Sequence, residues 1–490
     1  MPSSTSSYKP ATVAVLDIGS NSCRLVIARL HPESGFEVLD EARAMLRLAN
    51  EDPKAPIAGP TLARAEAAFP VFRQIADSYR PKRRVYVATS AVREAANRKD
   101  VARRFSDLLG HKVRVISAKD EAAYAVRAAV NSFSLARGTV IDLGGGSVQV
   151  AGFDGGEMKD WRSLPAGSLL LQRRFFEKGW SASAQTDLIA YVEGLLVESA
   201  PKVRLPAVFV GGTARALAKL HQRSYGYAWP WPHGYAFSLA QLGRLRKRLS
   251  ELDLDERRRL PGMNADRADT ILPGAIALER LCIANSIDRL VVSGEGVRHG
   301  VLYELLEERG LLAGDARSRS LASLSALASA PPYEEAALQL AARISAPPSP
   351  LESTTGEMLE LCLRLHRIGD VLGHERFDRS AEQMIMSREM AGFTHRDALL
   401  IAYTLGSFGR FRLRRAAVRP PLHPDDYKLV EQTSALLQLT VALARAGGAE
   451  ARVRWSAERL KIDTPTPPLE ADQLARRLKS AFGVEVLFSS

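Results

Sequence analysis

Cysteine is scarce in this chain of 490 residues, which contains only Cys23, Cys282 and Cys362. They form no CxxC pair and no cluster with histidine, so the sequence supports neither a disulfide framework nor a zinc site. This pattern favours a reducing cytoplasm. Apolar runs of membrane-spanning length are absent as well, so we expect a soluble protein that does not associate with membranes.

Low-complexity sequence is absent beyond the Ser/Thr-rich residues 1–10, which we interpret as a frayed tail. With 46% hydrophobic and 25% charged residues, the composition is that of a globular protein. Positive charge is in excess, with 67 Lys and Arg against 55 Asp and Glu and a formal net charge of +12. Long-range attraction then favours a polyanionic partner such as nucleic acid, acidic lipid or polyphosphate.

Two segments of the chain repeat the same pattern. An apolar strand at residues 12–16 leads into DIGSNS (residues 17–22) and a second strand, and an apolar strand at residues 139–143 leads into DLGGGS (residues 142–147) and another. The offset between Asp17 and Asp142 is 125 residues, the size of a domain. Strands and helices alternate around both motifs, which predicts two duplicated α/β domains that face each other.

Further patterns occur elsewhere in the chain. A strand at residues 207–210 enters Gly211-Gly212-Thr213 and a helix, the junction at which α/β proteins commonly bind ligands. The helix expected at residues 61–80 carries an interruption at Pro70. Ala- and Leu-rich helices follow over residues 321–446, and the tail returns to mixed strand and helix.

The glycine-rich turns are candidate phosphate sites, because their backbone N–H groups can donate to phosphate oxygens without bulky side chains in the way. A single Gly-Gly-Gly between strands is more typical of a tight turn, but three such loops, two of them related by repetition, favour binding. The candidate phosphate-binding residues of the loops are Gly19, Ser20, Asn21, Ser22, Gly144, Gly145, Gly146, Ser147, Gly211, Gly212 and Thr213.

Asp17 and Asp142 end equivalent apolar strands, where an aspartate is also an ordinary turn former. As a pair flanking a phosphate cleft, they could hold Mg²⁺ or another divalent cation such as Mn²⁺ through oxygen ligands or waters. Arg24, Arg93, Arg267 and Arg298 could clamp phosphate oxygens, although most arginines are solvated or ion-paired surface residues.

Ser117 and Asp120 match a capping box at the start of a helix. Glu121 follows them, in the first turn, where the helix dipole favours an acidic residue for structural reasons alone. Position by itself therefore does not make Glu121 a catalytic base.

Four ordered motifs resemble those of the exopolyphosphatase and guanosine pentaphosphate phosphohydrolase family: VLDIGSNS (residues 15–22), ATSAVREA (88–95), DLGGGS (142–147) and FVGGT (209–213). The resemblance covers residues 12 to about 305. It implies the actin, sugar kinase and heat-shock ATPase fold, with two ribonuclease-H-like domains that close around phosphates. It also implies that Glu121, from the motif SAKDEA (residues 117–122), is the base that activates the attacking water.

The helical region is similar to the family's HD phosphohydrolase-like part, although it contains no adjacent His-Asp pair. We therefore expect an α/β fold of two actin-like domains, a mostly helical HD-like domain and a small α+β tail, and a homodimer. The expected bounds are a disordered tail at 1–11, actin-like domains at 12–131 and 132–310, the HD-like domain at 311–447 and the small subdomain at 448–490.

These observations predict a Mg²⁺-dependent enzyme that releases terminal orthophosphate from inorganic polyphosphate, whereas nucleic acid is not the expected partner. Guanosine pentaphosphate is the alternative substrate. A kinase or ATPase would need an adenosine pocket that the sequence does not reveal, and a non-catalytic sensor of polyphosphate or guanosine tetraphosphate is a further alternative.

Gln149 departs from the family pattern Asp-x-Gly-Gly-Gly-Ser-x-Glu, because it places an amide where a metal-associated carboxylate normally lies. Strand alternation predicts that its side chain shares a face with Ser147. Gln149 is therefore a candidate metal-site residue, with an exposed strand position as the alternative.

Overall fold

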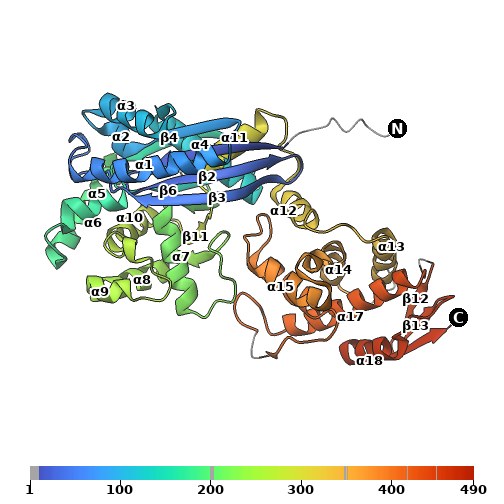
Figure 1. Cartoon of the computed structure of the whole chain (residues 1–490). Coiled ribbons are helices and arrows are strands. Elements are labelled where there is room, and N and C mark those ends of the chain that lie inside the picture. Colours follow the sequence, from blue (N-terminus) through green and yellow to red (C-terminus); the bar gives the residue numbers. More distant parts are fainter. Residues whose placement is uncertain are drawn as a thin grey trace. The chain divides into compact units, whose positions relative to one another are not determined.

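The computed structural model describes residues 10–198, 203–346, 349, 351–415, 418–448 and 450–489. They form two compact units (Figure 1). The first runs to Arg319, except for Gly226–Pro230, which belongs to the second unit together with the residues from Ser320 onward. Of the tail expected at 1–11, residues 1–9 lie outside the described residues, and the first strand begins at Ala11.

The first sheet has five strands in the order β3-β2-β1-β4-β5. Their bounds are β1 Ala11–Ile18, β2 Ser22–His31, β3 Gly35–Met45, β4 Arg83–Ala88 and β5 Val113–Val115. The two strands predicted around residues 17–22 are confirmed and form a hairpin, because β1 and β2 pair antiparallel with Ile18 opposite Cys23. Strand β3 is not predicted by the sequence, because its charged and largely unburied residues, at the edge of the sheet, hide the usual alternation.

The second sheet has the order β10-β11-β9-β6-β7-β8. Its strands are β6 Arg137–Leu143, β7 Val148–Asp154, β8 Glu157–Leu164, β9 Ala207–Val210, β10 Ala236–Ser238 and β11 Arg289–Val292. Counted from its edge strand β8, the second sheet has the order β8-β7-β6-β9-β11, which corresponds to β3-β2-β1-β4-β5 in the first sheet. In both sheets the central strand pairs antiparallel with one neighbour and parallel with the other: β6 with β7 and β9, and β1 with β2 and β4. The internal repeat is thus a repeat of topology.

Helix α1 (Pro60–Ser78) continues through Pro70, so the predicted interruption is wrong. Pro70 lies on the exposed side of the helix, whereas Phe69 and Phe72 on the opposite side are buried in the core of the first sheet. Phe69 meets Phe105 edge to face, with ring centroids 4.8 Å apart. Burial of this apolar face outweighs the cost of the proline, about 3 kcal/mol.

Two crossing helices join the two sheets. Helix α4 (Ala118–Phe133) follows the first sheet and packs on β6, β7 and β8 of the second, whereas α11 (Val297–Glu307) follows the second sheet and packs on β1 and β3 of the first. The helices contact each other so closely that a side chain at Gly300 would overlap the backbone of Tyr124. The crossing carries the first turns of α4 and α11 to the same cleft.

The remaining helices of the first unit surround the sheets, and α10 is buried on nearly all sides. They are α2 Ser90–Glu94, α3 Arg98–Leu109, α5 Ser168–Phe176, α6 Ala182–Glu198, α7 Gly212–Ser224, α8 Leu239–Glu251, α9 Leu254–Arg258, α10 Ile271–Ala284 and a 3-10 turn at Ala265–Arg267.

The second unit is helical before its last strands, as the sequence predicts, and α17 packs against α13, α14, α16 and α18. Its elements are α13 Glu334–Ser345, α14 Ser353–Leu365, α15 Phe377–Met386, α16 His395–Gly406, α17 Asp426–Arg445, β12 Arg452–Trp455, β13 Arg459–Asp463, α18 Ala471–Phe482, β14 Glu485–Ser489 and 3-10 turns at Ile368–Leu372 and His374–Arg376. Helix α12 (Ala316–Ser325) spans the boundary between the units. Across the part of the chain that the structure describes, no helix has the length and hydrophobicity to cross a membrane.

Candidate active site

The two repeated loops have the same backbone turn. Gly19 N–H donates to the Ser22 carbonyl at 3.2 Å, and Gly144 N–H donates to the Ser147 carbonyl at 2.9 Å. Each turn follows the strand that carries an aspartate, β1 with Asp17 or β6 with Asp142. The shared geometry supports a common role for the two loops.

The carbonyls of both loops are occupied by other parts of the chain. Ser20 and Asn21 accept from the N–H groups of residues 49 and 47, and Gly144 and Gly145 accept from those of residues 168–170. In a trans peptide the N–H group points opposite to the carbonyl. The N–H groups that follow these carbonyls are therefore turned the other way, as a phosphate cradle requires.

The loops face each other across a cleft of about 120 Å³. A side chain at Gly145 would place its Cβ 2.9 Å from the Asn21 backbone nitrogen. The third loop, at the N-terminus of α7, closes the cleft, and Gly212 lies so close to the Arg267 guanidinium that a Cβ there would overlap it. All eleven predicted loop residues line the cleft.

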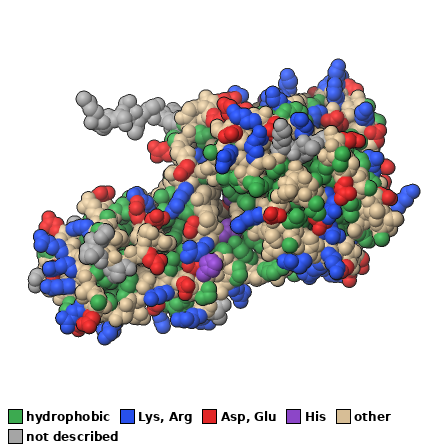
Figure 2. Space-filling view, turned by 180° about the vertical axis from the view of Figure 1, so that it is seen from behind, with side chains coloured by type: hydrophobic (Ala, Val, Ile, Leu, Met, Phe, Trp, Pro, Cys, Tyr) green, Lys and Arg blue, Asp and Glu red, His purple; other side chains and the backbone are tan. Residues whose placement is uncertain are grey.

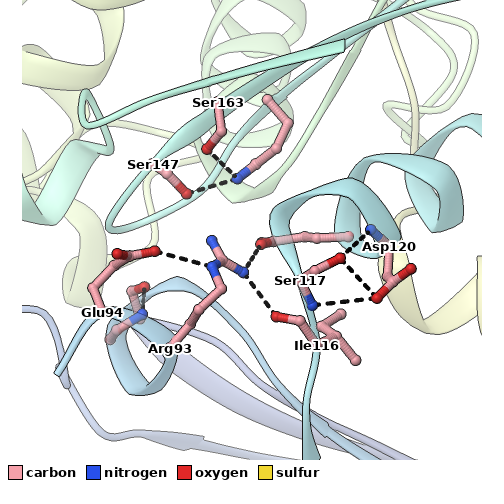
Figure 3. Close-up of polar contacts among 11 residues, drawn as sticks. Arg93, Glu94, Ile116, Ser117, Asp120, Ser147 and Ser163 are labelled. Carbon is pink, nitrogen blue, oxygen red and sulfur yellow. Dashed lines mark hydrogen bonds and ion pairs between the residues drawn. The ribbon is translucent and has the colours of Figure 1, made fainter. Parts of the chain in front are cut away.

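Glu121 enters the cleft from the first turn of α4. The predicted capping box is confirmed, because Ser117 Oγ accepts from the Asp120 N–H at 3.1 Å and Asp120 Oδ2 accepts from the Ser117 N–H at 3.3 Å (Figure 3). The cap fixes the helix start, so the Glu121 side chain is held at the cleft with 7% exposure. Burial raises its pKa from the ordinary 4.5 to about 7, although Arg93 acts in the opposite direction.

Arg93, which we assigned to phosphate binding, does not line this cleft and instead lies behind Glu121. Its Nη1 donates to Glu121 Oε2 at 2.8 Å and to the Ile116 carbonyl at 3.2 Å, and its Nε donates to Glu94 at 3.0 Å (Figure 3). With three acceptors engaged, the guanidinium orients the Glu121 carboxylate. The guanidinium is thus directed at Glu121 and not at the phosphate cleft.

Asp17 and Asp142 line the centre of the cleft. The pKa of Asp142 is raised to about 6, because burial and the nearby Asp17 raise it by more than Arg215 lowers it. Burial likewise raises the pKa of Asp17 against the effect of three arginines. Asp142 is buried and Asp17 is half-buried, and burial raises both pKa values even with arginines nearby. The oxygens of the two carboxylates are suitable ligands for a hard divalent cation.

Gln149 lies opposite Asp142 in the β6–β7 register and is 1% exposed. Its Nε2 donates to Ser147 Oγ at 2.7 Å, so the two side chains share a face, as the alternation predicts. The side chain is not exposed to solvent, and it does not itself line the cleft. Its Oε1 is buried without a hydrogen-bond partner, which leaves one oxygen donor next to the loop.

Arginines gather at the other end of the cleft, where Arg24, Arg215, Arg267 and Arg298 all contribute to the lining. The pKa of Arg24 is lowered to about 9 by burial and by the positive charges of the other three arginines and Arg43. The pKa of Arg267 is lowered to about 10 by burial and by Arg215 and Arg43. Glu41 pairs with Arg298 at 2.5 Å and lies 3.9 Å from Arg24, so one carboxylate offsets only part of the charge of these four crowded cations. The chemistry of this end therefore suits several phosphate groups.

The sequence profile of the Ppx/GppA phosphatase family matches residues 26–309, more than half of the chain. The chain belongs to the Ppx/GppA phosphatase family. Members of this family are phosphatases that hydrolyse phosphoanhydride bonds, and the chain is an enzyme of this class.

Relatives of this Ppx/GppA phosphatase carry two different names. A protein of Vibrio vulnificus, called guanosine-5'-triphosphate,3'-diphosphate pyrophosphatase, is 24% identical over 92% of this chain and 90% of its own length. Exopolyphosphatase 1 of Mycobacterium bovis is 27% identical over 60% of this chain and 88% of its own length. The Ppx/GppA protein of Aquifex aeolicus has a similar structure, with a TM-score of 0.53 and 27% identity over 61% of this chain and 99% of its own.

Three further residues of this Ppx/GppA phosphatase line the cleft although they were not among the predicted site residues: Arg215, Ser168 and Ser90. Arg215 lies in the first turn of α7, and its Nη1 donates to the Gly294 carbonyl at 3.2 Å. Arg215 could have been predicted to line the cleft, because it follows the Gly211-Gly212-Thr213 loop by two residues. Ser90 lies in the motif ATSAVREA (residues 88–95), which carries part of the family resemblance. For Ser168 no comparable signal exists, because it reaches the cleft only through the packing of α5.

The activity of the phosphatase is expected to depend on the ionisation of Glu121. Because a general base must be deprotonated and burial raises this pKa to about 7, kcat/KM should fall about tenfold per pH unit below pH 7 and level off above it. Initial rates at constant ionic strength and saturating Mg²⁺ measure this. A limb centred near 4.5, the ordinary glutamate value, would contradict the assignment.

Proposed function

We propose that this protein is an exopolyphosphatase that uses Mg²⁺ to release terminal orthophosphate from inorganic polyphosphate. The order of charges along the cleft carries the proposal. In the first sheet, β1 with Asp17 lies between β2, which carries Arg24, and β5, the strand that precedes the helix of Glu121. The base and Arg24 thus lie on opposite sides of Asp17, as a phosphate chain with one reacting end requires.

In the proposed reaction, the glycine-rich loops hold the terminal phosphate of the polyphosphate. The rest of the polyphosphate is held by the arginines that line the cleft, Arg24, Arg215, Arg267 and Arg298. Glu121 takes a proton from a water molecule as the water oxygen attacks the terminal phosphorus. The bond from that phosphorus to the bridging oxygen breaks, and the shortened chain leaves with the bridging oxygen. The attacking and leaving oxygens are roughly in line in such transfers, which matches the positions of the base and the arginines.

Asp17 and Asp142 fit Mg²⁺, because this ion usually binds one or two carboxylates together with substrate phosphates. When bound, it would neutralise charge on the phosphate oxygens. The two raised aspartate pKa values support a cation at this position, since a nearby positive charge would stabilise both ionised carboxylates.

Guanosine pentaphosphate is the alternative substrate, and the name of the Vibrio vulnificus relative favours it. The net charge of +12 favours polyphosphate. On the face shown in Figure 2, the described Lys and Arg side chains are scattered among Asp and Glu instead of forming one patch, which is consistent with attraction by overall charge.

We expect a higher kcat/KM for long polyphosphate than for guanosine pentaphosphate, assayed as orthophosphate release under identical salt. KM for the long chain should also rise with salt, because a chain bound at several phosphates releases counterions, by analogy with nucleic acids. A higher kcat/KM for guanosine pentaphosphate, or a KM for polyphosphate that salt does not change, would contradict the proposal.

Gln149→Glu is expected to lower the Mg²⁺ concentration that gives half-maximal activity. The substitution converts a partnerless buried oxygen into a carboxylate opposite Asp142, and a hard cation prefers the charged donor. Mg²⁺ titrations of the variant and the wild type measure this, with Gln149→Ala as the control that removes the oxygen. Superimposed curves for Gln149→Glu and wild type would place this residue outside the metal site.

A further inference from the structure

A second cavity, of about 860 Å³, adjoins the catalytic cleft on the side of Glu121. The two cavities share three lining residues, Ser90, Gly146 and Ser147. Arg93, which holds the Glu121 carboxylate, also lines the second cavity. Figure 3 shows Arg93 on one side of the place where the two cavities meet, and Ser147 with Ser163 on the other. The second cavity therefore meets the cleft where the reaction occurs, opposite the arginine cluster.

This position creates a problem of product release that the second cavity solves. In an in-line reaction the released orthophosphate lies between Glu121 and the end of the shortened chain. If the arginine side of the cleft were the sole opening, the chain would have to leave before the orthophosphate. An opening on the Glu121 side lets the orthophosphate leave first and lets the next water molecule reach the base.

We propose that the second cavity is a binding and exit site for the product orthophosphate, separate from the site of the phosphate chain. The inference rests on the proposed function, in which the chain occupies the arginine end of the cleft. It assigns a ligand, inorganic phosphate, to a cavity outside the catalytic loops.

The chemistry of the cavity suits a hydrated phosphate. Lys54 and Arg162 contribute positive charge, whereas Lys159, which also lines the cavity, pairs with Glu157 at 2.8 Å. Ser90 and Ser147 place hydroxyl groups at the junction. Two of the carboxylates in its wall are neutralised, since Glu94 pairs with Arg93 at 3.0 Å and Asp160 pairs with Arg204 at 2.7 Å. A volume of about 860 Å³ holds a phosphate and many waters, each of which occupies about 30 Å³.

The junction itself is narrow and is lined by small residues. A Cβ at Gly146 would lie 2.8 Å from the hydroxyl oxygens of both Ser20 and Ser90. The walls at this point are the short side chains of Ser20 and Ser90, which are buried, and Ser20 Oγ accepts from the Ala91 N–H at 3.2 Å. Small movements of these side chains are the opening that the proposal requires.

The first test is product inhibition of the wild-type enzyme by inorganic phosphate at several polyphosphate concentrations. If orthophosphate leaves first through the second cavity, it can rebind while the chain occupies the cleft, so added phosphate should lower kcat even at saturating polyphosphate. Purely competitive inhibition, which saturating polyphosphate abolishes, would overturn the proposal, because orthophosphate would then leave after the chain.

The second test fills the cavity with Ala118→Phe, since Ala118 is the first residue of α4 and lines the cavity. The matched control is Ala182→Phe, at the exposed first residue of α6 and outside the lining of this cavity. Acid quench measures the orthophosphate formed in the first turnover, and a phosphate-binding fluorescent sensor measures the free product. Ala118→Phe should form product at the wild-type rate but release it about tenfold more slowly.

Equal rates of formation and release in a folded Ala118→Phe variant would overturn the proposal. If this variant does not fold, the inhibition pattern of the wild type still decides. Failure of the wild type to form orthophosphate from polyphosphate would instead contradict the proposed function, and this inference with it. The two failures are therefore distinguishable.

Discussion

Glu121→Gln is expected to lower kcat on polyphosphate by about 10²–10⁴-fold, the usual contribution of a general base. The amide cannot accept the proton of the attacking water, although its size and position are unchanged. The fold should persist, because the capping box of Ser117 and Asp120 does not involve Glu121 and Arg93 keeps its bonds to Glu94 and Ile116. Orthophosphate release and polyphosphate binding, measured in parallel, check both parts.

The matched control for this variant is Asp120→Asn, one residue away. Asp120 is exposed and serves the helix cap, and an asparagine side-chain oxygen can still accept from the Ser117 N–H. We expect near-normal turnover in the control and unchanged polyphosphate affinity in Glu121→Gln. Turnover of Glu121→Gln comparable to that of the wild type would remove Glu121 from the role of base.

Gly145→Ala should have the second largest effect and lower kcat/KM by about 10²-fold, the cost of misplacing reacting groups by roughly 1 Å. The new methyl group would lie 2.9 Å from the backbone nitrogen of Asn21 and 3.0 Å from its Cβ. Backbone cannot rotate away as a side chain can, so the two phosphate loops must separate. Steady-state kinetics with polyphosphate measure the loss.

Gly194→Ala is the control for this substitution, because no atom lies within 4 Å of the added methyl group and the position is within α6. Alanine is about 1 kcal/mol more favourable than glycine inside a helix, so this variant should be fully active and somewhat more stable. If Gly145→Ala kept its catalytic efficiency, the close approach of the two loops would not matter for the reaction.

The loops could be predicted from sequence because each depends on local chemistry. In DIGSNS and DLGGGS the glycine positions allow one turn, and the offset of 125 residues indicates that the turns are equivalent. The structure shows the same hydrogen bond in both, from Gly19 to Ser22 and from Gly144 to Ser147. The capping box at Ser117 was predictable for the same reason, since all its atoms lie within four residues.

The environment of Glu121 was not predictable in this way. The sequence places the residue in the first turn of a helix, but its burial and raised pKa arise from packing between two domains. Arg93 lies 28 residues earlier in the chain, and its pairing with Glu121 depends on how α2 meets α4. We therefore assigned Arg93 to phosphate, whereas in the structure its charge is directed at the base.

The two halves of the site differ at one pair of equivalent positions in the repeat. Arg24 lies opposite Asp17 in one hairpin, and Gln149 lies opposite Asp142 in the other, at the same offset of 125 residues. Arg24 reaches the cleft and joins the arginine cluster, whereas Gln149 is buried against Ser147. These equivalent positions therefore contribute a cation, Arg24, to the arginine cluster of the cleft and a neutral amide, Gln149, beside the loop.

Hydrolysis of polyphosphate in water enriched with ¹⁸O tests the central claim most directly. If Glu121 activates water to attack the terminal phosphorus, each released orthophosphate should carry one ¹⁸O atom from the solvent and the shortened chain should carry none. Mass spectrometry of both products measures the label. Label at the new chain end, with unlabelled orthophosphate, would show attack on the penultimate phosphorus and would contradict the proposed mechanism.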